Sequence, residues 1–95
     1  MLLEVEKRAL MLFKILGNST RYIIIKSLYE GEKNVSHLSN ITKKKSTTIS
    51  KHLLILSEMD LVSFRTEENR VYYSLKKKKL IDLIEFAVNC MKRTK

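Results

Sequence analysis

The stretch whose residue types and spacing could do chemistry runs from Lys43 to Leu56, with the sequence KKKSTTISKHLLIL. Its apolar residues at Ile49, Leu53 and Leu56 recur at spacings of four and three, which places them on one side of a helix, against a core, with Leu54 and Ile55 beside them. The opposite side carries short hydroxyl side chains and a lysine, with no carboxylate among them. A helix with a polar, basic first turn that is anchored from behind fits the major groove of duplex DNA. The stretch is therefore predicted to be a DNA recognition helix.

Each polar residue of this stretch has a predicted role. The predicted readers of base edges are Ser46, Thr47, Ser50 and Lys51, because hydroxyl groups donate or accept hydrogen bonds and a threonine methyl can meet a thymine methyl. The lysines before them, Lys43, Lys44 and Lys45, are predicted to contact phosphates, which position a protein without specifying sequence. His52 is predicted to face outward toward the DNA backbone. The alternative interpretation is a solvated polar face with a half-buried histidine.

Two arginines flank a predicted turn further along the chain. Arg65 and Arg70 stand on either side of it, where either side chain could reach the minor groove or its phosphates. Glu67 and Glu68 lie within that turn and would repel phosphate. Deep insertion of this turn into a groove is therefore not favoured.

Composition bounds the class of partner. The 95 residues form one predicted domain, 1–95, and carry a net charge of +9 with a pI near 9.8, which favours nucleic acid over a membrane surface. No apolar run approaches the roughly 20 residues of a membrane span, and the charged start MLLEVEKRALMLF is unlike a signal peptide. The single cysteine excludes an internal disulfide and indicates a reducing compartment. The predicted location is the cytoplasm, with the chain encoded by a prokaryotic cell or by a mobile element within it.

The elements that must position these residues follow from the spacing of the hydrophobic residues. That spacing has the period of a helix up to about residue 59, alternates as in strands over the next two segments, and has the period of a helix again at the end. The predicted helices cover 2–16, 18 or 19–30, 35 or 36–40, the stretch after the lysines to about 59, and 77 to about 93; the predicted strands cover 61–66 and 70–75, around a turn at 67–69. A helix-turn-helix followed by a hairpin is a winged helix, a mainly α fold with a β-hairpin wing. The first and last helices are more apolar than a monomer needs, so they are predicted to pair two copies across a two-fold axis.

Three segments resemble the ArsR-type winged helix-turn-helix repressors. The opening run of that family resembles residues 12–28, LFKILGNSTRYIIIKSL. Its recognition helix and following strand resemble residues 46–62, and its wing strand resembles residues 70–75, RVYYSL. The resemblance covers residues 10 to 76 and implies a homodimeric transcription regulator, often a repressor that a metal releases.

Several family features are absent from this chain. Metal-sensing members place paired cysteines where Asn34 and Ser36 stand, or use histidines with acidic residues on the last helix, where only Asp82 and Glu85 are present. No metal and no cofactor are therefore expected. The family's capping position falls on Lys45, and a lysine cannot accept a hydrogen bond from a free amide, so Ser46 is predicted to be the cap.

Other functions remain as alternatives. Cys90, His37 and His52 match neither a metal site nor a catalytic pair, and no constellation for an enzyme is present. Cys90 is predicted to be a small apolar residue, or else to form a disulfide with its mate in a dimer. The alternative functions are a protein-interaction module that docks through Ile23 and the last helix, and a protein that coats nucleic acid without sequence preference.

Overall fold

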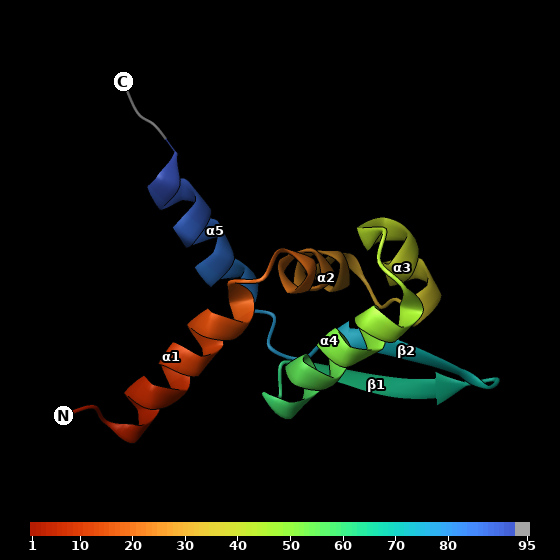
Figure 1. The fold of residues 1–95 in the computed structure, drawn as a ribbon, viewed down its shortest axis with the longest axis horizontal. Helices are drawn as coiled ribbons and strands as arrows, with labels where there is room; N and C mark the ends of the chain where they lie inside the picture. The colour runs from red at the N-terminus through yellow and green to blue at the C-terminus, as the bar shows by residue number, and fades with distance from the viewer. Residues whose placement is uncertain (93–95) are drawn as a thin grey trace.

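The computed structural model describes residues 1–92 and contains a winged helix-turn-helix fold, which confirms the predicted order of elements (Figure 1). Three helices and the recognition helix are followed by an antiparallel hairpin and a final helix. The elements are α1 (Glu4–Leu16), α2 (Ser19–Glu30), α3 (Val35–Thr42), α4 (Ser46–Glu58), β1 (Val62–Glu67), β2 (Arg70–Leu75) and α5 (Leu80–Met91).

The ends of several elements differ from the predicted ones. Helix α1 begins at Glu4 rather than at residue 2, because Leu3 is its N-cap and the carboxylate of Glu6 accepts a hydrogen bond from the Leu3 amide at 2.8 Å. Helix α3 continues two residues past the predicted end and stops at Lys43, whose φ is +61°. Strand β1 is shifted by one residue, to Val62–Glu67.

The start of α5 is the largest correction. The Lys76 amide donates to the Leu61 carbonyl at 2.8 Å, and tight turns follow over Lys77, Lys78 and Lys79 before the helix begins at Leu80. The predicted helix start at residue 77 was therefore wrong, since these residues have a helical composition but are held by the end of the hairpin. The predicted end near residue 93 lies outside the described residues.

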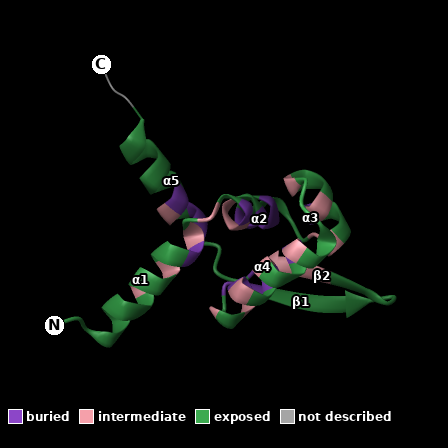
Figure 2. Cartoon of the chain, in the orientation of Figure 1, coloured by how far each residue is buried: buried purple, intermediate pink, exposed green. Residues whose placement is uncertain are grey.

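The core lies where α2, α3, α4, the base of the hairpin and the first turns of α5 meet (Figure 2). The predicted inward residues of α2 and α4 are buried, except that Tyr22 is only half-buried. The fully buried large side chains are Ile24, Ile25, Leu38, Ile49, Leu53 and Leu56. This cluster fixes α4 against α2 and α3 from behind, which leaves the other side of α4 in solvent.

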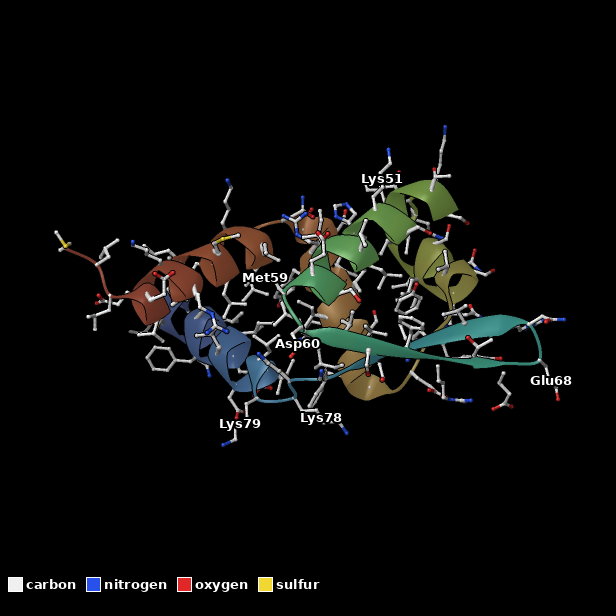
Figure 3. All side chains as sticks on the ribbon, turned by 90° about the horizontal axis from the view of Figure 1, so that it is seen from below. Lys51, Met59, Asp60, Glu68, Lys78 and Lys79 are labelled. Carbon is white, nitrogen blue, oxygen red and sulfur yellow. The ribbon has the colours of Figure 1, made fainter. Side chains whose placement is uncertain are left out.

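The hairpin is joined to the helical body at its base and at its middle. Val62 and Leu75 are paired and buried at the base. Further out, Lys33 and Tyr73 exchange backbone hydrogen bonds of 2.8 and 3.0 Å, which attach β2 to the loop between α2 and α3. The outer half of the hairpin projects beyond the body, with Glu68 at its tip (Figure 3).

Helices α1 and α5 extend away from the body on the side opposite the hairpin tip (Figure 1). Most of both helices is exposed, as Figure 2 shows, although both sequences are rich in apolar residues. The exposed apolar side chains here are Val5, Leu10, Met11 and Phe13 of α1 and Phe86, Val88 and Met91 of α5. A single copy of the chain thus leaves two neighbouring helices with apolar surface that nothing covers.

Candidate nucleic-acid interface

The outward side of α4 has the composition that the sequence predicted for it. Ser46, Thr47, Ser50 and Lys51 are all exposed, while Ile49 between them and Leu53 and Leu56 after them are buried. Figure 3 shows Lys51 pointing away from the molecule, on the side of α4 opposite the hairpin. Three donors or acceptors of hydrogen bonds and one cation are therefore presented together on a helix that the core holds rigidly.

The N-terminus of α4 corrects one prediction. Lys45 is the N-cap, in an extended conformation, and its carbonyl accepts from the Ile49 amide at 3.0 Å. Ser46 is the first residue of the helix, so the prediction that Ser46 is the cap was wrong. No side chain caps α4. Its first backbone N–H groups, with the positive end of the helix dipole, are left facing outward, which favours an anion such as a phosphate.

The lysine run lies in the loop between α3 and α4. Its backbone is fixed, because the Ser39 hydroxyl donates to the Lys44 carbonyl and the Lys44 amide donates to the Thr42 hydroxyl at 3.3 Å. The side chains of all three lysines, 43 to 45, are exposed. This arrangement places three cations beside the uncapped start of α4, where they add to its positive potential.

His52 is half-buried and bonded to Arg21 of α2. The guanidinium of Arg21 lies 3.2 Å from His52 Nδ1, and its Nε donates to the Ile15 carbonyl at 2.7 Å. A guanidinium can only donate, so Nδ1 accepts and the ring proton sits on Nε2. Partial burial, followed by the positive charges of Arg21 and Lys44, lowers the pKa of His52. The ring is thus a neutral donor that is held in one orientation.

Arg65, a predicted groove contact, is engaged within the protein. Its guanidinium pairs with Glu32 and with Glu67, and it lies 5.0 Å from the centre of the Tyr72 ring. The hydrogen bond from Arg65 lowers the pKa of Glu32, and the two carboxylates raise the pKa of Arg65. Arg70 is exposed on the opposite strand, in register with Glu67. The charges along the middle of the wing are therefore compensated, and Glu68 adds a carboxylate at its tip.

One exposed residue on α4 was absent from the predicted site. Leu54, which the sequence placed beside the core residues, is 60% exposed. It follows Thr47, Ser50 and Lys51 by seven, four and three residues, which are the spacings of neighbours on one face of a helix. That spacing alone would have predicted that Leu54 lies on the exposed face, but its apolar residue type led to the interpretation that it lies beside the core.

Other cations, and the remaining residues that the sequence singled out, lie elsewhere. Lys78 and Lys79 lie on the side of the molecule opposite Lys51 (Figure 3), so they do not belong to the same surface. Asn34 caps α3 by accepting from the His37 amide at 2.8 Å. Cys90 is an exposed free thiol on α5, and its pairing with a second copy stays a prediction.

Residues 1–92 contain neither of two further kinds of site. No three side chains of the histidine, cysteine, aspartate or glutamate type gather there as metal ligands. None of the helices described is long and apolar enough to cross a membrane.

The fold and this surface together define a winged helix-turn-helix protein, and comparison with known proteins gives its family. Residues 18–63 match the family described as bacterial regulatory protein, arsR family. The chain is 37% identical over 76 residues to a CadC homologue, a cadmium resistance transcriptional regulatory protein of Staphylococcus aureus, covering 79% of this chain and 63% of that protein. It is 32% identical over 85 residues to the transcriptional activator HlyU of Vibrio cholerae, covering 86% and 79% respectively.

A solved structure gives the same result. A homodimeric winged helix-turn-helix DNA-binding domain from Mycobacterium bovis, described as a possible ArsR-family transcriptional regulator, matches with a TM-score of 0.80 and 27% identity, covering 90% of this chain and 82% of that domain. The chain belongs to the ArsR family of bacterial regulatory proteins, as its sequence resemblance predicted. The chain spans 63% of the length of the CadC homologue and 79% of the length of HlyU.

Proposed function

We propose that this chain is a transcriptional regulator that binds double-stranded DNA with sequence specificity as a homodimer. The observation that carries the proposal is the outward face of α4. Four exposed polar residues, 46, 47, 50 and 51, lie beside an uncapped helix start and three exposed lysines, on a helix whose other side is fully packed. In the major groove this face reads base edges with its side chains and holds phosphates with the lysines.

The proposed dimer forms through α1 and α5. Their uncovered apolar side chains supply a continuous interface, and the Mycobacterium bovis neighbour is itself homodimeric. A two-fold axis through these helices gives two copies of α4, which contact two half-sites about one turn of DNA apart. The simplest consequence is repression, because a bound dimer occludes a promoter. The relative HlyU is named an activator, so a reporter gene is needed to establish the sign of regulation.

The proposal includes three further expectations. The chain is not an enzyme, it acts in the cytoplasm, where bacterial DNA is, and it responds to no metal through the two sites known in the family. The last expectation rests on Asn34 and Ser36 at the start of α3 and on the lack of histidine in α5. Addition of Cd²⁺ or Zn²⁺ to the DNA complex should leave its Kd unchanged. A release of DNA by either ion would refute this part.

Selection of bound duplexes from a random pool tests the function. The expected product is a palindrome, bound with a steep salt dependence: a dimer that contacts six to ten phosphates loses about 10³–10⁵ in affinity between 50 and 200 mM salt. Recovery of no common sequence would refute specific readout and favour a coating protein, and the absence of any duplex binding would favour the interaction module.

Two variants separate the recognition helix from the wing. Lys51→Ala should weaken binding of the selected duplex at least tenfold, because each dimer loses two cations from the groove. Arg65→Ala should change the affinity less than threefold, because that guanidinium is already paired with Glu32 and Glu67. The reverse order would place the wing, and not α4, at the centre of recognition.

A further inference from the structure

Leu54 lies on the outward face of α4, where a solvated helix ordinarily carries a polar residue. It is 60% exposed, and it follows Ser50 and Lys51 by about one helical turn and Thr47 by about two on the same face. A single exposed leucine is ordinary on a protein surface. The informative feature is its position, because this face is the one that the proposed function inserts into the major groove.

The other residues of this face limit what it can distinguish. Arginine or lysine bonded to guanine, and asparagine or glutamine bonded to adenine, are the side chains that most often discriminate bases through paired hydrogen bonds. In α4, Ser46–Glu58, only Lys51 is of this kind, and the exposed side otherwise offers hydroxyl groups, Leu54 and, at the end of the helix, Glu58. Serine and threonine hydroxyls accept several bases, so they discriminate weakly. The apolar contact to the methyl group on C5 of thymine is a further discriminating interaction in the major groove, and Leu54 is a large apolar side chain that is exposed for it.

We propose that Leu54 is a specificity-determining residue that contacts the C5-methyl group of a thymine in each half-site. The inference rests on the proposed function and names the base chemistry that α4 recognises. The Leu54 side chain loses water on contact with the methyl group, which is favourable for both apolar groups. A uracil, or a cytosine without a methyl group, lacks the contact.

The geometry also places a second thymine. Thr47 carries a methyl group on the same face, seven residues before Leu54. Seven residues of helix span about 10 Å at 1.5 Å per residue, and base pairs are about 3.4 Å apart along the duplex. If α4 lies along the groove, the thymine at Leu54 is therefore about three base pairs from the one that faces Thr47.

Replacement of single thymines by deoxyuridine in the selected duplex tests the proposal, because it removes only the methyl group. With the native chain, one thymine per half-site should show about a three- to fivefold loss of affinity on replacement, the value expected for one buried methyl-sized group. With Leu54→Ala, replacement of this thymine should no longer reduce the affinity. Replacement of a second thymine, the one that faces Thr47, should still reduce it. Circular dichroism of Leu54→Ala serves as the folding control. The spectrum should match that of the native chain, because the side chain that is removed is exposed.

Two further variants make the comparison specific. Leu54→Met keeps an apolar side chain and should keep the preference for thymine over deoxyuridine, whereas Leu54→Asn has a polar group and should lose it. Equal sensitivity to deoxyuridine in the native chain and in Leu54→Ala would overturn the inference, as would a selected sequence without a conserved thymine. In both cases specific DNA binding would still be observed, whereas failure of the proposed function would appear as no selected duplex at all.

Discussion

At the scale of single residues, the contact between Arg21 and His52 connects three helices. Arg21 lies in the first turn of α2. Its guanidinium donates to the Ile15 carbonyl near the end of α1 and to His52 Nδ1 of the recognition helix. The contact requires a neutral imidazole, because a protonated ring would present an N–H group to a guanidinium that can only donate. His52 therefore couples the position of α4 to its own protonation state.

This contact predicts a dependence of stability on pH. The pKa of His52 is lowered in the folded chain from an ordinary value of 6.5, by burial first and by Arg21 and Lys44 next. The unfolded chain therefore takes up a proton first as the pH falls, so the stabilising contribution is complete above about pH 7 and is lost below it, down to the folded pKa. The loss should be no more than about 1 kcal/mol, because solvent screens a half-exposed group.

Chemical denaturation of the native chain and of His52→Gln at pH 7.5 and 5.5 measures the effect. The native chain should lose more stability on acidification than this variant, while His37→Gln should behave as the native chain. An equal loss in the native chain and in His52→Gln would contradict the assignment. Glu32 and Asp60 do not interfere, because their pKa values are lowered from 4.5 and 3.8 and they titrate below this window.

At the scale of elements, the wing has an unfavourable turn. Glu67 pairs with Arg70, so Glu68 and Asn69 alone form the turn, with φ of +50° and +66°. Two positive φ values are the condition of the tight hairpin turn in which asparagine and glycine are preferred. Asparagine tolerates this conformation, but the β-carbon of a glutamate is strained in it.

Glu68→Asn should therefore stabilise the fold by up to about 1 kcal/mol. For a domain of this size such a gain raises the Tm by about 4–8 °C. Thermal unfolding followed by circular dichroism measures it. Glu68→Ala is the matched control, since it removes the charge but keeps a strained β-carbon, and it should leave the Tm nearly unchanged. Equal stabilisation by both variants would assign the effect to repulsion between Glu67 and Glu68 instead.

At the scale of the whole molecule, charge and apolar surface are separated. The basic face of α4 and the lysines before it lie away from the hairpin, whereas the apolar surface of α1 and α5 lies at the other end of the molecule from the wing tip (Figures 1 and 3). This arrangement lets a dimer form through one surface while each copy keeps its recognition helix free. In the proposed dimer, a chain of 95 residues would share its apolar surface with a second copy and so gain a larger core.

Phe86→Glu should therefore produce a monomer. Phe86 of α5 is 69% exposed in the single chain, and a carboxylate there would be buried without a partner in the proposed dimer. Sedimentation equilibrium measures the mass, and DNA affinity should fall with dimerisation because the two half-sites are no longer held together. Tyr29→Glu, at an exposed aromatic residue of α2 outside this surface, should remain dimeric. A dimer of unchanged stability for Phe86→Glu would place the interface elsewhere.

The sequence by itself determined the order of elements, the residues that α4 buries, and the side of α4 that faces solvent. These follow from hydrophobic period, which is a local property of the chain. The family was indicated separately, by the resemblance of residues 12–28, 46–62 and 70–75 to the ArsR-type repressors.

Only the tertiary structure decided which charged and apolar side chains remain available. Arg65 is bonded to Glu32, which is 33 residues earlier, and Arg21 to His52, which is 31 residues later, and no local pattern encodes such pairs. Leu54 has the residue type of a core position, yet α2 and α3 cover only the opposite side of α4. Residue type and period state what a helix can bury, but the neighbouring elements decide what it does bury, because burial requires a second surface.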